Sequence, residues 1–293
     1  MTTKNLTVTI VIPNWNGKAL LERHLPGILE ASDDAEIIVV DDASDDVSVQ
    51  FLSENYPKIK IINKNKHEGY ASTINLGVQH ARADIVVLLN SDVEPEKGFL
   101  KPLLRHFSDP NVFAVGCMDK SIENGKTTLR GRGIASWING FYIHKRGEVD
   151  KMDTAWVSGG SGAFRKRMWE QLHGMDPLFN PFYWEDIDLS YRAIEKNYRL
   201  VFEPKSIVTH YHEKGKILTT YKPKEVLQIS YRNQFLFIWK HVKGIQIVKH
   251  LFWMPVRIFQ SISRGEDAMV LGFVKAILFL PDIFRYRVKN ISL

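Results

Sequence analysis

The residues that could carry out chemistry in this chain are mainly carboxylates, and the densest group lies at 185–188. Glu185, Asp186 and Asp188 follow directly after the aromatic residues 182–184. Aromatic surroundings raise the pKa of a carboxylate towards the range that a general base needs. Acids at an ordinary helix N-terminus are the structural alternative, because the helix dipole favours negative charge there. The aromatic run in front favours the functional interpretation.

A second acidic loop, Asn90-Ser91-Asp92, follows the apolar run 85–89. A carboxylate at the end of such a strand could ligate a hard divalent cation. The cation could in turn neutralise a departing diphosphate. Asn, Ser and Asp are also common turn residues, so the spacing alone leaves a plain turn open.

The pair Asp41-Asp42 ends another apolar run in the same way. One of these carboxylates could accept a hydrogen bond from a nucleobase N–H or a ribose hydroxyl. A helix N-cap by Ser44 or Asp45 is an equally good interpretation of this motif.

Two further groups could support such chemistry. His210 and His212 lie at positions i and i+2 of a strand-like segment and therefore share one face, where either could complete a metal shell or bind phosphate. The loop Ser158–Gly162 offers backbone N–H groups to an anion or a hydroxyl. The structural alternative is a core histidine for the first group and a tight turn for the loop.

These candidates are spaced along an alternation of strand and helix patterns. Apolar strands are expected at 8–12, 37–40, 59–62 and 85–89, with helices at 18–31, around 49–52 and at 71–81. Strands that are apolar throughout are buried on both faces, and helices between them imply parallel order. Ligands bind beyond the carboxyl ends of such strands, where the polar loops follow. The glycine-rich dinucleotide and P-loop fingerprints do not occur in the sequence, which argues against both classes of enzyme.

The second half of the chain has a different character. Glycines and charged residues between 119 and 155 predict hairpins or a mobile flap. Helices are expected at 165–172 and from the acids at 185 to about 197, with a short strand near 200–202. From Lys224 onward the pattern is helical, amphipathic and basic.

Composition and charge narrow the class of protein. The 293 residues are 44% hydrophobic and 25% charged, which excludes a largely disordered chain and a polytopic membrane protein. The single cysteine, Cys117, excludes an internal disulfide framework and a multi-cysteine zinc site. Without a secretory pattern at its start or an apolar stretch of about 20 residues, we expect a cytoplasmic protein that is at most peripheral on a membrane.

The positive charge is concentrated in the C-terminal extension, residues 221–293. This segment has 12 basic and 4 acidic residues, a net charge of +8, whereas residues 1–220 have a net charge of −2. A basic, aromatic-rich tail on a near-neutral body fits an anionic membrane surface at least as well as a nucleic acid, and we expect no nucleic-acid partner. A homodimer interface and ordinary packing against the rest of the chain stay open.

An ordered set of motifs resembles glycosyltransferase family 2, especially its rhamnosyltransferase-like branch. The resemblance covers about residues 7–215, and it rests on Val11-Ile12-Pro13-Asn14-Trp15-Asn16, Val40-Asp41-Asp42-Ala43-Ser44, Gly69-Tyr70-x4-Asn75-x-Gly77, Leu89-Asn90-Ser91-Asp92, Gly159-Gly160-x-Gly162-Ala163, Gly174-Met175-Asp176-x-x-Phe179, Trp184-Glu185-Asp186-Ile187-Asp188-Leu189-x-x-Arg192 and His210.

The resemblance implies a GT-A fold, an α/β architecture with a mostly parallel central sheet, together with a UDP-, dTDP- or GDP-sugar donor, Mn²⁺ or Mg²⁺, and inversion at the anomeric carbon. It implies that Asp186 is the catalytic base with Glu185 beside it, and that Asp92 and His210 bind the metal. Asn90 stands where the family has the first acid of its D-x-D motif. The implied nucleotide-binding residues are Pro13, Asn14, Trp15, Asn16, Asp41, Asp42, Gly69, Asn75, Asn90 and Ser91, and the implied acceptor-binding residues are Gly159, Gly160, Ser161 and Trp184.

We therefore expect a catalytic domain over 1–220, with a nucleotide-binding half at 1–118 and an acceptor-binding half at 119–220, followed by the C-terminal extension. The predicted activity is transfer of a sugar to a glycan or lipid-linked saccharide. A nucleotidyltransferase and a non-catalytic sugar-nucleotide-binding protein are the alternatives. The first would need a basic, glycine-rich loop in place of 13–17, and the acids at 185–186 argue against the second.

Overall fold

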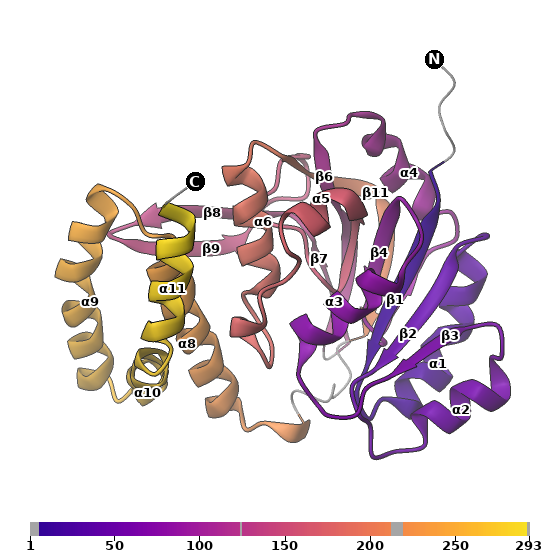
Figure 1. The fold of residues 1–293 in the computed structure, drawn as a ribbon, viewed down its shortest axis with the longest axis horizontal. Coiled ribbons are helices and arrows are strands. Elements are labelled where there is room, and N and C mark those ends of the chain that lie inside the picture. Colours follow the sequence, from indigo (N-terminus) through magenta and orange to yellow (C-terminus); the bar gives the residue numbers. More distant parts are fainter. Residues whose placement is uncertain (1–5, 124, 212–218, 292–293) are drawn as a thin grey trace. The chain divides into compact units, whose positions relative to one another are not determined.

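The computed structural model describes residues 6–123, 125–211 and 219–291, and the chain divides into two compact units (Figure 1). The first unit comprises Met1–Ile134, Arg146–Pro181 and Glu185–Lys216, and the second comprises Ala135–Lys145, Phe182–Trp184 and Ile217–Leu293. The second unit therefore contains the whole of the C-terminal extension, together with short segments from within the expected catalytic domain.

The first half of the chain alternates strands and helices as the sequence predicts. Its elements are β1 (Val8–Asn14), α1 (Lys18–Ala31), β2 (Glu36–Asp41), α2 (Ser48–Asn55), β3 (Lys60–Asn63), α3 (Tyr70–His80) and β4 (Ile85–Leu89). The strands are parallel in the order β3-β2-β1-β4. Their carboxyl ends consequently lie along one edge of the sheet, and this edge presents the polar loops that follow them.

The sheet continues as β10-β6-β11-β5 and is mixed: β6 and β11 run in the same direction as the first four strands, whereas β10 and β5 run against their neighbours. This part contains β5 (Val93–Pro95), α4 (Leu100–Leu104), the 3₁₀ helix η1 (Arg105–Ser108), β6 (Val112–Glu123), β7 (Lys126–Arg130), β10 (Ser161–Arg165), α5 (Lys166–Gln171), η2 (Pro177–Phe179), α6 (Glu185–Glu195) and β11 (Arg199–Tyr211). β10 is antiparallel to both β4 and β6. β11 is much longer than the expected strand at 200–202, because pairing with β6 resumes after an irregularity between Glu203 and Ile207.

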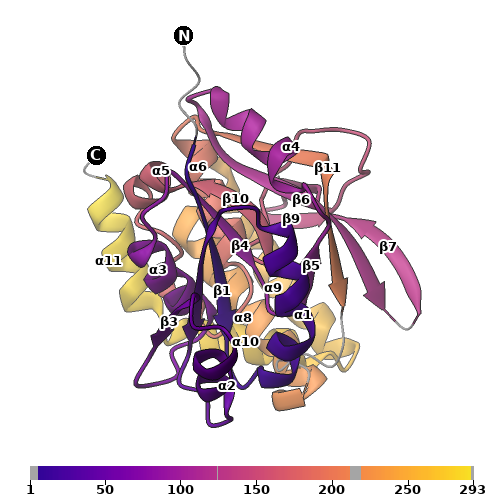
Figure 2. The same cartoon turned by 90° about the vertical axis from the view of Figure 1, so that its right-hand side faces the viewer.

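Alternate residues of the central strands enter two different hydrophobic clusters. Ile10 and Ile12 of β1 pack in a cluster with Leu25 of α1, whereas Val11 packs in a cluster with Ile74 of α3. The helices α1 and α3 thus cover opposite faces of the strands (Figure 2). Burial on both faces is the reason that these strands are apolar at every position.

The second unit consists of helices and part of a hairpin. The hairpin strands are β8 (Gly133–Ile138) and β9 (Phe141–Arg146), and the helices are α8 (Pro223–His241), α9 (Ile245–Ser263), α10 (Asp267–Ile277) and α11 (Leu280–Ile291). The core of this unit is aromatic, with Phe141 packed edge-on against Phe235. Across the parts of the chain that the structure describes, no helix combines the length and the apolar character that crossing a membrane requires.

The close packing of α3 on the sheet gives a first prediction. A Cβ atom on Gly77 would lie 2.4 Å from Cγ1 of Val11 and 2.9 Å from Cγ2 of Val40. Overpacking a dense core costs about 1–3 kcal/mol, which outweighs the gain of about 1 kcal/mol in helix propensity. We expect Gly77→Ala to lower the free energy of unfolding in urea by about 1–2 kcal/mol.

The matched control is Ser53→Ala in the exposed part of α2, where the new side chain enters no core. This control should leave the free energy of unfolding unchanged or raise it slightly. A Gly77→Ala protein as stable as the wild type would contradict the tight contact between α3 and the sheet.

Candidate active site

The paired acids Glu185 and Asp186 are the first two residues of α6. Glu185 is only 7% exposed, and within the described chain its Oε2 atom has no hydrogen-bond partner. Burial, and after it the neighbouring charge of Asp186, raises the pKa of Glu185 well above its usual value. This environment favours the neutral form of Glu185.

Asp186 is half-buried and keeps its charge more easily. Its Oδ1 accepts the backbone N–H of Ile187 at 2.8 Å, and its Oδ2 accepts that of Gly159 at 3.4 Å. Burial raises the pKa of Asp186 to about 6, and these two hydrogen bonds oppose the increase. At neutral pH this carboxylate is ionised but more basic than an exposed one, which is the property that a general base requires.

The turn before α6 has a strained backbone. Tyr183 and Trp184 adopt positive φ angles of 72° and 77°, a region that costs of order 1–3 kcal/mol for residues other than glycine. Within the second unit, the fully buried Asn233 of α8 donates from Nδ2 to the carbonyls of Phe182 at 2.9 Å and Tyr183 at 2.8 Å. These hydrogen bonds hold the backbone that continues directly into Glu185.

Trp184, an expected acceptor residue, is only 3% exposed. Its ring packs against His144 and Phe237, with ring centroids 4.7 Å and 5.2 Å apart. The side chain is thus enclosed by residues of its own unit, and its contact with an acceptor stays a prediction.

His210 of β11 links two carboxylates. Its Nε2 atom lies 3.2 Å from Oδ1 of Asp92, and its Nδ1 atom lies 3.1 Å from Oδ2 of Asp119. The other oxygen of Asp119 accepts a hydrogen bond from Ser121 Oγ at 2.9 Å. Burial alone would lower the pKa of His210, but the hydrogen bonds to Asp119 and Asp92 outweigh burial and raise the pKa to about 9.

Asp92, together with His210 once its Nε2 atom has released its proton, could hold a divalent cation here. Among the described residues there is no cluster of three or more His, Cys, Asp or Glu side chains placed to bind a metal ion. One or two protein ligands completed by phosphate oxygens are typical of Mg²⁺ sites that act on nucleotides, so the pair fits a cation that shares a diphosphate. His212 lies outside the described residues.

Tyr70 lies among all of these acids. Its hydroxyl donates to Oδ1 of Asn90 at 3.2 Å. Burial, followed by the charges of Glu185, Asp186 and Asp92, raises the pKa of Tyr70 well above its usual value. The hydroxyl of Tyr70 thus experiences the charge of both acidic loops.

The loop at Gly159 and Gly160 also touches both acidic loops. The N–H of Gly159 reaches Asp186, and the carbonyl of Gly160 accepts the N–H of Asn90 at 3.0 Å. A Cβ atom would lie 2.9 Å from Cε of Met175 at Gly159 and 2.6 Å from Nδ2 of Asn90 at Gly160, so the approach requires glycine at both positions. Ser161 follows as the buried first residue of β10.

Asp42, at the carboxyl end of β2, is almost fully buried and has four donors. Lys64 Nζ lies 2.5 Å from its Oδ1, and His67 Nδ1 lies 2.8 Å from its Oδ2. The backbone N–H groups of Glu68 and Gly69 donate to it at 3.0 Å and 2.9 Å. This cluster ties β2 to the loop that precedes α3.

The ring of Trp15 stacks on that of His67, with centroids 4.0 Å apart and an interplanar angle of 18°. An aromatic surface beside a buried carboxylate suits a planar, polar ligand such as a nucleobase. Pro13 is half-buried at the end of β1, and Ser91 approaches the same loop, since a Cβ on Gly17 would lie 3.7 Å from its Oγ.

Asp41 and the asparagines of the first loop hold the strand ends together. Asp41 is fully buried and accepts hydrogen bonds from Asn14 Nδ2 at 2.7 Å, Ser44 N at 2.8 Å and Ser44 Oγ at 2.6 Å. Oδ1 of Asn16 accepts the N–H of Asp45 at 2.6 Å. These side chains shape the loops, and contacts of Asn14, Asn16 and Asp41 with a nucleotide stay predictions.

Asn75 has different partners from the residues around Asp41. Its amide makes two hydrogen bonds with the backbone of Met175, at 2.7 Å and 2.9 Å, which fasten α3 to the loop before η2. Its predicted contact with the nucleotide is not tested by this arrangement.

Sequence reasoning missed Tyr70, Asp119, His67 and Lys64. Asp119 follows the apolar run Val112–Met118, which is the same pattern that drew attention to Asp92 and could have identified it. Tyr70 lies inside the motif Gly69-Tyr70-x4-Asn75-x-Gly77, which by itself does not indicate a role for its hydroxyl. His67 and Lys64 carry no local pattern, because their contact with Asp42 depends on the path of the loop after β3.

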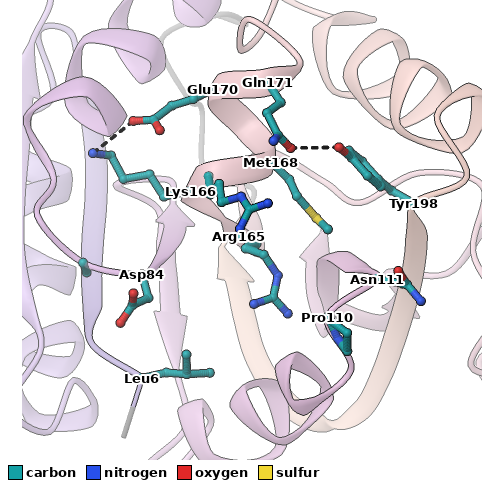
Figure 3. A pocket seen from close by; sticks show the side chains of 12 residues that line it. Leu6, Asp84, Pro110, Asn111, Arg165, Lys166, Met168, Glu170, Gln171 and Tyr198 are labelled. Carbon is teal, nitrogen blue, oxygen red and sulfur yellow. Dashed lines mark hydrogen bonds and ion pairs between the residues drawn. The ribbon is translucent and has the colours of Figure 1, made fainter. Parts of the chain in front are cut away.

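A pocket of about 650 Å³ lies elsewhere in the first unit (Figure 3). It is lined by Asp84, which precedes β4, and by Arg165, which ends the antiparallel β10. Figure 3 shows the ion pair of Lys166 with Glu170 at its rim. The pocket is therefore at the amino edge of the parallel strands, opposite the edge that carries the acidic loops, and none of its lining residues is an expected site residue.

The chain matches known proteins over most of its length. The family profile described as Glycosyl transferase family 2 matches residues 9–172, more than half of the chain. A pre-mycofactocin glycosyltransferase from Mycobacterium tuberculosis is 28% identical over 207 residues, which cover 70% of this chain and 43% of that protein. The chain thus spans less than half the length of this curated relative.

Two solved structures share the fold. The crystal structure of GalNAc-T7 with UDP, GalNAc and Mn²⁺ has a TM-score of 0.69 and 17% identity, and covers 97% of this chain and 57% of that chain. The mannosyltransferase PcManGT from Pyrobaculum calidifontis, in complex with GDP-Man and Mn²⁺, has a TM-score of 0.59 and 18% identity, and covers 99% of this chain and 88% of that chain. These likenesses confirm the predicted GT-A fold. The profile match shows that the chain belongs to glycosyltransferase family 2.

Proposed function

We propose that the protein is an inverting, metal-assisted glycosyltransferase. It moves a sugar from a nucleoside-diphosphate sugar to a hydroxyl of a glycan or lipid-linked saccharide. The observation that supports the proposal is that the Gly159–Gly160 loop bonds both Asp186 and Asn90, the residue that begins the Asn90-Ser91-Asp92 loop. A carboxylate for a cation and a carboxylate for a proton at one site are what displacement at an anomeric carbon needs.

In this mechanism Asp186 removes the proton from the acceptor hydroxyl as its oxygen bonds to the anomeric carbon. The bond between that carbon and the diphosphate oxygen breaks on the opposite side, so a single displacement inverts the configuration. Glu185 stays protonated and leaves Asp186 as the anionic member of the pair. Asp42 and the ring of Trp15 bind the nucleobase in this proposal.

Asp92 and His210 would hold the divalent cation, Mn²⁺ or Mg²⁺. When bound, the cation neutralises negative charge on the departing diphosphate. Asp119 fixes His210 by accepting from its Nδ1, which directs Nε2 towards Asp92. The Mn²⁺ in the structures of GalNAc-T7 and PcManGT supports the use of a divalent cation.

The identity of the donor is the least constrained part of the proposal. The relatives act with different sugars, and the two solved structures contain UDP and GDP-Man. We propose, from the sequence motifs, membership of the rhamnosyltransferase-like branch, with action at the cytoplasmic face of a membrane. Thermal-shift measurements with UDP-, dTDP- and GDP-sugars in the presence of Mn²⁺ would identify the donor.

Replacing the base should separate transfer from binding. We expect Asp186→Asn to reduce the rate of sugar transfer by about 10²–10⁴-fold, because the amide cannot take the acceptor proton. The dissociation constant of the donor nucleotide, measured by calorimetry, should change little. The surface variant Glu170→Gln in α5 is the matched control and should keep full activity. Equal loss of binding and transfer in Asp186→Asn would contradict its assignment as the base, and binding with no transfer by the wild type would favour the non-catalytic alternative.

The rate should also depend on pH in a specific direction. Because burial raises the pKa of Asp186 to about 6, protonation below that pH removes the base. We expect kcat to rise as the pH increases through about 6 and to reach a plateau above it. A kcat profile that is flat from pH 5 to 8, with chemistry as the slow step, would rule out this ionisation as the controlling one.

Asp119 gives a test of the cation site that does not depend on turnover. We expect Asp119→Asn to weaken Mn²⁺ binding in the presence of UDP or GDP by about 10–100-fold, because His210 loses its anionic partner. Nucleotide binding without metal should be unaffected. Asp92→Ala serves as the positive control with a larger loss. Unchanged Mn²⁺ affinity in Asp119→Asn, measured by titration calorimetry, would overturn its positioning role.

A further inference from the structure

The helix α9 of the second unit exposes its apolar face. Six large apolar side chains, Ile245, Val248, Leu251, Phe252, Phe259 and Ile262, are between 59% and 71% exposed. The buried residues of the same helix are His250 and Ser261, which are polar. A surface helix of a globular protein normally has the reverse arrangement.

Hydrogen bonds fix the rotation of α9 about its axis. Trp239 of α8 donates from Nε1 to Nε2 of His250 at 3.1 Å, and Nδ1 of His250 lies 2.9 Å from the carbonyl oxygen of Gly140. The helix α9 lies close against the hairpin, because a Cβ on Gly140 would lie 2.1 Å from the backbone N of His250. The six apolar residues consequently point away from these contacts, over about 120° of the helix circumference at 3.6 residues per turn.

The charge along α9 itself is of one sign. Lys249 is exposed beside the apolar face, Arg264 is exposed directly after the last residue of the helix, and the sequence has no acidic residue between Glu225 and Glu266. A basic helix whose exposed face is apolar is typical of one that lies flat in the interface of an anionic bilayer.

A second copy of the chain is a weaker candidate for the occupant. Two copies of α9 would bring lysines and arginines together without acidic partners, and like charges disfavour such pairing. Pro255 also interrupts the heptad spacing on the exposed face and removes a backbone donor within the helix. A continuous helix-to-helix seam is therefore disfavoured.

We propose that the exposed face of α9 binds the surface of a bilayer that contains anionic lipids. Phe252 and Phe259 enter the acyl boundary, Lys249 faces the headgroups, and Arg264 adds basic charge at the end of the helix. The contact does not depend on the donor or on the base, and it would bring the chain to a lipid-linked acceptor.

Flotation of the full chain with vesicles tests the proposal. At low salt we expect binding to vesicles of phosphatidylcholine with 30% phosphatidylglycerol, and little binding to phosphatidylcholine alone. The variant Phe252→Ser/Phe259→Ser should bind at least tenfold less, and Lys249→Glu/Arg264→Glu should lose most of the dependence on anionic lipid. The matched control replaces two exposed apolar residues of the first unit, Val47→Ser/Leu129→Ser, and should bind as the wild type.

Other results would overturn the proposal or assign the exposed face to a different occupant. Failure of the wild type to float with anionic vesicles would overturn the proposal, as would equal binding to neutral vesicles. A dimer in sedimentation equilibrium that the Phe252→Ser/Phe259→Ser variant abolishes, without vesicle binding, would assign the face to a second copy. Circular dichroism melting shows whether each variant is folded. Sugar transfer to a soluble acceptor should persist in the α9 variants, so loss of membrane binding is distinguishable from failure of the proposed activity.

Discussion

Two carboxyl groups on neighbouring residues, buried at the start of one helix, are the constraint on which the site depends. Burial and mutual repulsion disfavour ionisation of both groups at once. Glu185 is the more deeply buried and has the more strongly raised pKa, which leaves the negative charge on Asp186. Within the described residues neither forms an ion pair, so this arrangement is stabilised by backbone N–H groups and by the fixed turn before α6.

The topology of the sheet explains why acids so far apart in sequence meet. β10 is antiparallel to β4, so its first residue pairs with the last residue of β4, in the register Ser161–Leu89. The glycines before β10 therefore meet Asn90. In the same way β11 is antiparallel to β5, and its register pairs His210 with Val93, which places the histidine beside Asp92. The contacts of Asn90 and Asp92 therefore follow from the way these strands are paired.

The partners of the remaining acids separate structural roles from chemical ones. Asp188 is fully buried and pairs with Arg192, whose guanidinium also bonds the carbonyl of Gly174. It therefore ties α6 to the preceding loop, although it stands only two residues from Asp186. Asp41 and Asp42 are neighbours as well, but the first closes the loops around Ser44 and the second faces the stacked rings of Trp15 and His67. Spacing in the sequence does not distinguish such pairs, because the partners come from distant segments.

Structure that depends on neighbouring residues could be predicted from the sequence, whereas structure that depends on pairing between distant segments could not. The parallel strands, the first helices and the loops after Val40 and Leu89 could be predicted, because apolar runs and turn residues determine them. The antiparallel β10, the full length of β11 and the role of Asp119 could not, because they depend on strands that are distant in the chain. The orientation of α9 could not be predicted from the sequence either. Its periodicity predicts a helix with an apolar stripe, and such stripes usually face a core. Only the hydrogen bonds of His250 determine that here the polar side faces inward and the apolar side is left for another surface.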